Sequence, residues 1–305
     1  MRAAVIDCGT NTIRLLVADP GDGDSLVDVD RRLELVRLGQ DVDATHRFHP
    51  DALARTFKAL DTYAERIHEL DVERVRFLAT SAARDVSNGD ELVEGVRSRL
   101  GVDVDVISGD EEARLSFLGA LSGGPVHAGP VLVMDVGGGS TELILGDVDG
   151  GVRVARSLDM GSVRIRERFL AGDPPTASEV EAAHDFVDGL LDGSGVPVDE
   201  AGTWIGVAGT ATSLSAMSQG LATYDRSRVH NSVIGVDEIN ALADRLLATS
   251  VADVMAVYPT LERLRAEVIC AGALIVAHVA ARAGIAMTVR ETDILDGATL
   301  ELLRR

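Results

Sequence analysis

The sequence predicts an α/β protein built from two related domains. Its 305 residues fit two domains at roughly 100–200 residues each. Short apolar runs typical of strands alternate with amphipathic helical patterns. The opening pattern then restarts, because Asp135 follows Asp7 at the same offset (135 − 7 = 128) that separates Gly137 from Gly9. We therefore expect domains over residues 1–124 and 125–305, with a helix at about 293–305 that could pack back on the first.

The first domain is expected to open with a strand, a tight turn and a second strand. Residues 3–7 and 13–19 are apolar runs of strand length, and the segment Cys8-Gly-Thr-Asn11 between them is rich in turn formers. Residues 49–69 place apolar side chains three and four apart, which indicates an amphipathic helix. The remaining expected elements are strands at 25–31, 75–80 and 104–108 and helices at 89–100 and 111–121.

The second domain is expected to begin in the same way. A strand at 131–135 is followed by a glycine-rich turn over 136–141 and a second strand at 142–147. The remaining expectations are a strand at 151–157, a helix at 178–191, a strand at 203–207, a loop at Ala208-Gly209-Thr210 and a mostly helical region from 237, with a buried helix at 266–283.

The composition is strongly acidic. Against 49 Asp and Glu stand 29 Lys and Arg, a formal net charge of −20, and Lys58 is the single lysine. Such a surface repels nucleic acids and anionic membranes, so neither is an expected partner. The acids are spread along the chain, as in proteins of salt-accumulating halophiles, so we expect folding to depend on salt.

The sequence also predicts a cytoplasmic location. The N-terminus enters a strand pattern without a leader-like segment, and no apolar run reaches the ~20 residues that span a bilayer. Cys8 and Cys270 lie far apart in the sequence and suggest neither a disulfide framework nor a metal knuckle. Both thiols are best interpreted as small buried residues in a reducing compartment.

The duplicated Asp-x-Gly turns point to phosphate chemistry. Successive backbone N–H groups in a glycine-rich turn form a concave anion site, and glycine lets the backbone approach phosphate oxygens closely. An aspartate at the head of such a turn can hold Mg²⁺ or Ca²⁺. The alternative interpretation is that the glycines simply make turns and that Asp7 and Asp135 cap them. Two matching copies favour phosphoryl transfer.

Six ordered motifs resemble a known family. They are Asp7-Cys-Gly-Thr-Asn-Thr-Ile-Arg-Leu, Thr80-Ser-Ala-Ala-Arg84-Asp, Ser108-Gly-Asp-Glu-Glu112-Ala-Arg-Leu, Asp135-Val-Gly-Gly-Gly-Ser-Thr-Glu-Leu, Gly161-Ser-Val-Arg164-Ile-Arg-Glu-Arg-Phe169 and Val207-Ala-Gly-Thr-Ala-Thr-Ser-Leu. Together they resemble the short form of the exopolyphosphatase and guanosine pentaphosphate phosphohydrolase (Ppx/GppA) family, within the actin-like ATPase and sugar kinase superfamily. The resemblance implies two ribonuclease H-like domains with an active-site cleft between them.

The resemblance also implies residue roles. Glu112 and Glu142 match catalytic acids, Arg84 matches the arginine that holds the terminal phosphate, and Asp135 matches a metal-binding aspartate with Asp7 as its counterpart. The implied ion is Mg²⁺ or another divalent cation such as Mn²⁺ or Ca²⁺. The residues expected to bind phosphate or substrate are Gly9, Thr10, Asn11, Thr12, Gly137, Gly138, Gly139, Ser140, Thr141, Gly209, Thr210, Arg164 and Arg166.

Each assignment has a simpler alternative. Glu112 could be a solvated acid like its neighbour Glu111, and Glu142 could be an ordinary edge-strand charge. Arg84 could pair with Asp85 or with a surface acid. His230 is either a packed or solvated histidine or a polyphosphate contact.

Two loops also depart from the family pattern. Thr10 and Thr12 stand where serine is common in the first loop, and Ala208 stands where a second glycine is usual in the third. The first change keeps the hydroxyl groups, whereas the second affects how closely that loop can approach a phosphate.

The favoured function is an exopolyphosphatase that hydrolyses terminal phosphate from inorganic polyphosphate by water attack. Guanosine pentaphosphate 5′-phosphohydrolase is the alternative within the same chemistry. An ATP-dependent kinase or a non-catalytic phosphate or nucleotide sensor is the alternative from another class. The resemblance further suggests a homodimer.

Overall fold

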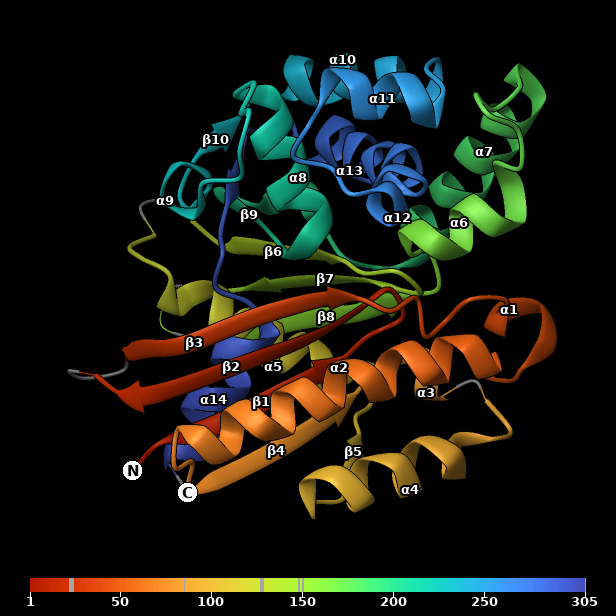
Figure 1. The fold of residues 1–305 in the computed structure, drawn as a ribbon. Coiled ribbons are helices and arrows are strands. Elements are labelled where there is room, and N and C mark those ends of the chain that lie inside the picture. The colour runs from red at the N-terminus through yellow and green to blue at the C-terminus, as the bar shows by residue number, and fades with distance from the viewer. Residues whose placement is uncertain (22–24, 85, 127–128, 148, 150, 305) are drawn as a thin grey trace. The chain divides into compact units, whose positions relative to one another are not determined.

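The computed structural model describes the chain except residues 22–24, 85, 127–128, 148, 150 and 305. It divides into two compact units, each with its own sheet (Figure 1). Unit 1 comprises Met1–Ser122 together with Ile294–Arg305, and unit 2 comprises Gly123–Asp293. The C-terminal segment thus belongs to the unit that the N-terminus begins. Among the described residues, no helix is both long enough and apolar enough to cross a bilayer.

Unit 1 is built on a five-stranded sheet in the order β3-β2-β1-β4-β5. The first three strands are antiparallel neighbours, while β4 and β5 continue the sheet in parallel with β1. Its strands are β1 (Ala3–Cys8), β2 (Thr12–Pro20), β3 (Leu26–Leu35), β4 (Arg74–Ala79) and β5 (Val104–Val106). Its helices are α1 (Val42–Thr45), α2 (Pro50–Glu69), α3 (Ser81–Arg84), α4 (Gly89–Leu100), α5 (Gly109–Ser122) and α14 (Ile294–Arg304).

Helices cover both faces of this sheet, which explains why every residue of β1 is buried. Ala4 and Ile6 pack with α2 and α4 on one face, whereas Val5 packs with α5 and α14 on the other. Helix α14 approaches α5 very closely, because a Cβ on Gly297 would lie 2.0 Å from the carbonyl oxygen of Leu115. The C-terminal helix therefore completes the core of unit 1.

Unit 2 repeats the plan with a six-stranded sheet in the order β10-β11-β9-β6-β7-β8. The hairpin β6–β7 and strand β8 are antiparallel, and β9 and β11 extend the sheet in parallel. Its strands are β6 (Val131–Val136), β7 (Thr141–Gly146), β8 (Val152–Leu158), β9 (Thr203–Val207), β10 (Val233–Ile234) and β11 (Met287–Val289). Its helices are α6 (Ser162–Phe169), α7 (Ala177–Gly193), the 3₁₀ turn η1 (Val198–Glu200), α8 (Ala208–Ser218), α9 (Arg226–Val229), α10 (Val236–Leu247), α11 (Val251–Val257), α12 (Arg263–Ala266) and α13 (Ile269–Ala283).

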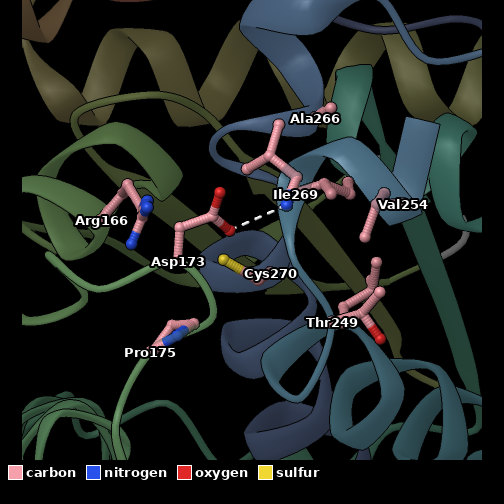
Figure 2. A pocket seen from close by; sticks show the side chains of 10 residues that line it. Arg166, Asp173, Pro175, Thr249, Val254, Ala266, Ile269 and Cys270 are labelled. Atoms are coloured by element: carbon pink, nitrogen blue, oxygen red, sulfur yellow. Dashed lines mark hydrogen bonds between the residues drawn. The ribbon is translucent and has the colours of Figure 1, made fainter.

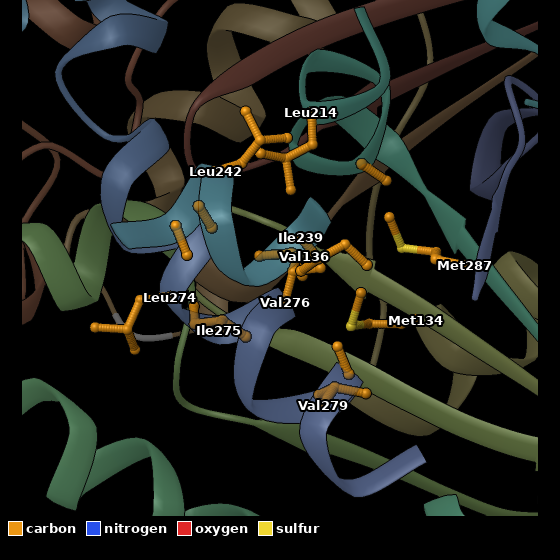
Figure 3. Close-up of a cluster of buried hydrophobic side chains, with 14 of the residues drawn as sticks. Met134, Val136, Leu214, Ile239, Leu242, Leu274, Ile275, Val276, Val279 and Met287 are labelled. Carbon is orange, nitrogen blue, oxygen red and sulfur yellow. The ribbon is translucent and has the colours of Figure 1, made fainter. Parts of the chain in front are cut away.

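The core of unit 2 lies between its sheet and helix α13 (Figure 3). Met134 and Val136 of β6 meet Ile275 and Val276 of α13, and Leu214 of α8 packs into the same cluster. Small residues along α13 allow neighbouring helices and the sheet to approach it closely. This packing fixes the end of β6, where the glycine-rich turn begins.

The predicted fold class is confirmed, and the local differences have physical causes. The expected loop at Ala208-Gly209-Thr210 is instead the first turn of α8, entered through a left-handed backbone at Ala208 (φ 61°). Strand β11 lies in the region expected to be mostly helical, because parallel pairing with β9 outweighs the weak propensity of a three-residue segment.

Candidate active site

In the turn between β1 and β2, the peptide carbonyls face residues 36–39, which follow β3. The N–H of Gly9 donates to the carbonyl of Thr12 at 2.9 Å and closes the turn. The carbonyl of Thr10 accepts from Gly39 N–H at 2.8 Å. The carbonyl of Asn11 accepts from two further N–H groups of the same segment, at Val36 and Arg37.

The turn between β6 and β7 has the same construction. Gly137 N–H donates to Ser140 carbonyl at 3.0 Å, and the carbonyls of Gly137, Gly138 and Gly139 accept from the start of α6. Gly161 makes this approach possible, since a Cβ there would lie 2.2 Å from the carbonyl oxygen of Gly138. The glycine-rich turn is therefore locked onto α6 through its carbonyl side.

This anchoring orients the N–H groups of both turns. In a trans peptide the N–H points opposite to the carbonyl. Since the carbonyls of residues 137–139 face α6, the N–H groups of residues 138–140 face away from it, and the N–H groups of residues 11 and 12 are turned in the corresponding way. Asn11 is 8% exposed, and its buried Oδ1 is without a hydrogen-bond partner among the described residues. Backbone N–H groups oriented in this way are donors of the kind that bind an anion.

Among the hydroxyl groups expected at the phosphate loops, those of Thr141 and Thr210 contact backbone carbonyls, whereas that of Thr10 contacts another side chain. The hydroxyl of Thr141 is fully buried and donates to the carbonyl of Met160 at 2.6 Å, and that of Thr210 donates to the carbonyl of Val136 at 3.2 Å. These two hydroxyls hold the backbone of unit 2 together. In unit 1, Thr10 Oγ1 lies 3.0 Å from Ser81 Oγ at the start of α3, which ties the first turn to the segment that carries Arg84.

The aspartates at the two hairpins face cross-strand partners of opposite charge: a cation in unit 1 and an anion in unit 2. Asp135 on β6 lies opposite Glu142 on β7, and both carboxylates are buried, at 7% and 1% exposure. Glu142 Oε1 accepts a hydrogen bond from Ser157 Oγ at 2.7 Å. Asp7, by contrast, lies opposite Arg14, and its Oδ2 accepts from the guanidinium at 2.6 Å and 3.1 Å.

These contacts bear on the expected metal ligands. Two neighbouring carboxylates are oxygen donors of the kind that Mg²⁺ prefers, so Asp135 and Glu142 fit a divalent ion. No cluster of three or more His, Cys, Asp or Glu that could hold a metal occurs among the described residues. A donor set this small suits an ion that keeps several waters and takes substrate oxygens. The guanidinium at Asp7 argues against the expectation that Asp7 is an equivalent ligand.

Arg84 and Glu112 are brought together within unit 1. Arg84 Nη1 donates to Glu112 Oε2 and to the carbonyl of Ile107, both at 2.9 Å. Glu112 lies in the first turn of α5 and is 8% exposed, so its carboxylate is held in one place. The alternative partner expected for Arg84, Asp85, lies outside the described residues.

The third expected loop has a different environment. A Cβ on Gly209 would lie 2.0 Å from Nη1 of Arg265, so the glycine accommodates this guanidinium against the start of α8. The close approach that sequence analysis assigned to a phosphate is therefore made, at Gly209, by a side chain of the protein itself.

The two arginines expected to bind phosphate or substrate have different contacts. Arg164 Nε donates to the carbonyl of Gly139 at 2.8 Å, directly at the glycine-rich turn. Arg166, two residues further along α6, instead donates to the carbonyl of Gly172 and lines a small pocket beside Asp173 and Cys270 (Figure 2). The pocket has room for roughly one water molecule, at about 10 Å³. Burial raises the pKa of the Cys270 thiol.

His230 packs inside unit 2. Its Nδ1 accepts from the N–H of Glu291 at 3.1 Å, and its Nε2 lies 3.0 Å from the carbonyl of Gly123. This pattern fits the neutral tautomer with the proton on Nε2. His230 is thus half-buried and contacts two backbone groups of unit 2.

Comparison with known proteins identifies the family. The model of the Ppx/GppA phosphatase family matches residues 16–301. The chain belongs to this family. It is 45% identical over 316 aligned positions to Exopolyphosphatase 2 of Mycobacterium tuberculosis, covering 99% of this chain and 98% of that one. Solved family structures include an exopolyphosphatase-like protein (37% identity, TM-score 0.94, 100% and 99% of the two chains) and the Aquifex aeolicus member (32%, TM-score 0.84, 100% and 98%).

Three contacts at the candidate site of this Ppx/GppA chain are not apparent from the sequence: Arg14 with Asp7, Ser157 with Glu142, and Ser81 with Thr10. The first does not follow from the internal repeat, because the match 14 + 128 = 142 does not give the hairpin register that pairs Arg14 with Asp7. The other two join segments far apart in the sequence, so only the fold brings them together.

Proposed function

We propose that this chain is an exopolyphosphatase, a phosphoric anhydride hydrolase that releases orthophosphate from the end of inorganic polyphosphate. The observation that carries the proposal is the 45% identity to Exopolyphosphatase 2 of M. tuberculosis over nearly the full length of both chains. The donor-lined turns and the buried carboxylates at the hairpins are the groups that such a reaction requires.

In the proposed reaction, backbone N–H groups of the two hairpin turns bind phosphate oxygens. The Glu112 carboxylate accepts a proton from the attacking water while the water oxygen forms a bond to the terminal phosphorus. The bond from that phosphorus to the bridging oxygen breaks, and the shortened polyphosphate leaves. Arg84 orients Glu112 through its present 2.9 Å contact and neutralises charge on the terminal phosphate. Arg164, which contacts the glycine-rich turn, supplies further positive charge for the chain.

Mg²⁺ is the proposed ion, with Asp135 and Glu142 as its protein ligands. When bound, it would neutralise negative charge on the phosphate oxygens as the anhydride bond breaks. The two carboxylates supply oxygen donors from adjacent strands, and Ser157 fixes one of them.

Substitution of Glu112 by Gln tests the role of this carboxylate. Gln keeps the size of the side chain but cannot accept a proton, so phosphate release from polyphosphate with Mg²⁺ should fall by about 10²- to 10⁴-fold. The matched control is Glu111→Gln, because Glu111 pairs with Arg114 one turn along the same helix and should be dispensable. Equal activity of wild type and Glu112→Gln would refute the role of Glu112, and no release by the wild type would refute the function.

The substrate itself is tested by comparing polyphosphate, guanosine pentaphosphate and ATP in the same assay. All three present a terminal phosphate, so a preference must come from contacts beyond it. Polyphosphate is expected to give the highest kcat/KM. Preferential release from guanosine pentaphosphate would favour the nucleotide phosphohydrolase, and phosphoryl transfer from ATP to an acceptor would favour a kinase.

The proposed setting is the cytoplasm of a halophilic cell, with the protein as a homodimer. The acidic excess supports the salt-rich setting, and the family resemblance supports the dimer. Size-exclusion chromatography with light scattering in about 1 M KCl, where the Debye length is ~3 Å, measures the oligomeric state.

A further inference from the structure

Thr10, in the turn between β1 and β2, is held by neighbours on two sides. Its Oγ1 lies 3.0 Å from Ser81 Oγ, and both residues are buried. Its methyl carbon Cγ2 faces Gly39, since a Cβ added at Gly39 would lie 2.1 Å from it. The N–H of Gly39 also donates to the carbonyl of Thr10 at 2.8 Å. The hydroxyl, the methyl group and the carbonyl of Thr10 therefore each have a defined neighbour.

The methyl group of Thr10 determines the direction of its hydroxyl. Both groups are attached to Cβ, so a single rotamer about χ1 places them together. When Cγ2 fills the space that Gly39 leaves open, Oγ1 faces Ser81. A serine at this position would lack the methyl group, and its hydroxyl would be free to adopt other rotamers. Thr10 and Gly39 thus form a matched pair that selects one hydroxyl direction.

The second hairpin turn has no side chain at the matched position. Gly138 corresponds to Thr10 in the internal repeat, because 10 + 128 = 138. Its carbonyl accepts from N–H groups at the start of α6, as the carbonyl of Thr10 accepts from Gly39. A turn of this construction therefore forms without a hydroxyl at this position. The hydroxyl of Thr10 has a different use, which its contact with Ser81 indicates.

Ser81 links the first turn to the groups proposed to act on the terminal phosphate. It begins α3, a helix of about one turn that ends at Arg84. The guanidinium of Arg84 donates to the Glu112 carboxylate at 2.9 Å. The contact between the two hydroxyls therefore sets the position of α3 relative to the backbone N–H groups of the turn. Such alignment matters, because a displacement of about 1 Å can cost about 10²-fold in rate.

We infer that Thr10 is a positioning residue, whose hydroxyl donates to Ser81 and not to a phosphate of the substrate. A phosphate oxygen accepts hydrogen bonds, and a hydroxyl has a single proton to donate, so the proton of Thr10 serves one partner or the other. Gly39 is part of the same device, because it makes room for the methyl group that directs the hydroxyl. The inference rests on the proposed function for the reaction that is aligned.

A double-mutant cycle on phosphate release from polyphosphate with Mg²⁺ tests this role. Thr10→Val keeps the shape of the side chain and removes its hydroxyl, and Ser81→Ala removes the partner. Each is expected to lower kcat by about 3- to 10-fold with little change in KM, and the double variant should be no slower than either one. A Ser81→Ala variant as fast as the wild type, or two effects that multiply, would overturn the inference in favour of a direct phosphate contact.

Thr56→Val is the matched control for the loss of a buried threonine hydroxyl in unit 1. The hydroxyl of Thr56 donates to the carbonyl of Ala52 within α2, at 2.9 Å. It has no part in the proposed site, so Thr56→Val should keep the kcat of the wild type. Circular dichroism establishes that each variant is folded.

Exchange of the two methyl groups tests the role of Gly39. The backbone of Gly39 lies outside the left-handed region, so alanine is allowed there apart from its contact with Thr10. Gly39→Ala should lower kcat by at least about 3-fold, because its methyl group collides with that of Thr10. Thr10→Ser/Gly39→Ala removes one methyl group and supplies the other, so it should recover most of the lost activity. A folded double variant that is no faster than Gly39→Ala would contradict the pairing of these residues.

Urea denaturation of the same variants separates this inference from the proposed function. The contact between Thr10 and Ser81 exists without substrate, so their substitutions should also be non-additive in the free energy of unfolding. A wild type that releases no phosphate would refute the proposed function, whereas this coupling would still test the contact. An active wild type whose variants show additive effects in both measurements would overturn the inference alone.

Discussion

At the scale of single residues, Ala208 occupies a backbone conformation that suits glycine. Its φ is 61°, in the left-handed region, where a Cβ costs about 1–2 kcal/mol. Glycine avoids this cost but makes the unfolded chain more flexible, which offsets about 0.4–1 kcal/mol. We therefore expect Ala208→Gly to raise the free energy of unfolding by up to about 1.6 kcal/mol, measured by urea denaturation.

The control is an alanine in an ordinary helical position. Ala241 is exposed in the interior of α10, so Ala241→Gly should lower the free energy of unfolding by about 1 kcal/mol. The two substitutions remove the same methyl group, and only the backbone conformation differs between them. A lower stability of Ala208→Gly, similar to that of Ala241→Gly, would show that the left-handed conformation is not strained.

The candidate site also shows which residues a sequence can reveal. Asp135 and Glu142 stand out because each belongs to a motif next to a glycine-rich turn. The partner of Asp7 does not stand out, because an arginine on a strand reads as an ordinary charge until the register of the hairpin is known. The separation of Arg164 from Arg166 follows from the helix, in which residues two apart point to different sides.

At the scale of elements, the hairpins and long helices were predictable because each carries a local signal. Helix α2 runs from Pro50 to Glu69, as the apolar spacing over residues 49–69 predicts, and the hairpin turns begin where the Asp-x-Gly motifs place them. Strand β11 and the start of α8 have no such signal. Their conformations depend on pairing with β9 and on the packing of Arg265 against Gly209, which are contacts between distant segments.

The segments that begin and end unit 2 are joined by His230. The histidine accepts from Glu291 N–H near the end of the unit and contacts the carbonyl of Gly123 at its beginning. Burial lowers the pKa of His230, and the positive charges of Arg226 and Arg290 lower it further, against opposing effects of the Gly123 carbonyl and Glu291. Protonation would place a proton on Nδ1 and break the contact with Glu291 N–H.

The sign of the pH effect follows from this lowered pKa. Above the unfolded-state pKa of about 6.5 both states are neutral and the contacts are intact. As the pH falls below that value the unfolded state takes up the proton more readily, so the stability of this region falls. Hydrogen exchange of residues 121–126 and 287–293, corrected for intrinsic rates, should therefore become faster between pH 7.5 and pH 5.5, a window of about one unit on each side of that pKa.

Substitutions at two histidines separate this effect from general acid destabilisation. His230→Gln cannot titrate, so exchange of the same segments should be faster at neutral pH but should change little on acidification. His68→Gln, at an exposed position on α2, should behave like the wild type. This local measurement is needed because burial also lowers the pKa of His278, which reduces global stability in the same pH range. An unchanged pH response in His230→Gln would contradict the prediction.

At the scale of the whole molecule, the charge of −20 governs stability and substrate binding together. Many arginines already contact carboxylates, as Arg31 does Asp296 and Arg76 does Asp105, so much of the positive charge is matched locally while the surplus acid remains. Self-repulsion of that surplus destabilises the compact state and also opposes the approach of a polyanion. Salt screens both effects over a Debye length of ~10 Å at 0.1 M and ~3 Å at 1 M.

We therefore expect added salt both to stabilise the folded protein and to strengthen its binding of polyphosphate. Between about 0.05 M and 1 M KCl, Tm should rise by at least about 5 °C, or roughly 2 kcal/mol, as measured by calorimetry. The KM for long-chain polyphosphate should fall over the same range, whereas a protein that attracts polyanions through a positive surface loses affinity as salt increases. Potassium sulfate at equal ionic strength is the control, since screening depends on ionic strength and preferential exclusion of sulfate would give a larger effect. A Tm independent of KCl, or a KM that rises with it, would show that the acidic surface does not control folding and substrate access.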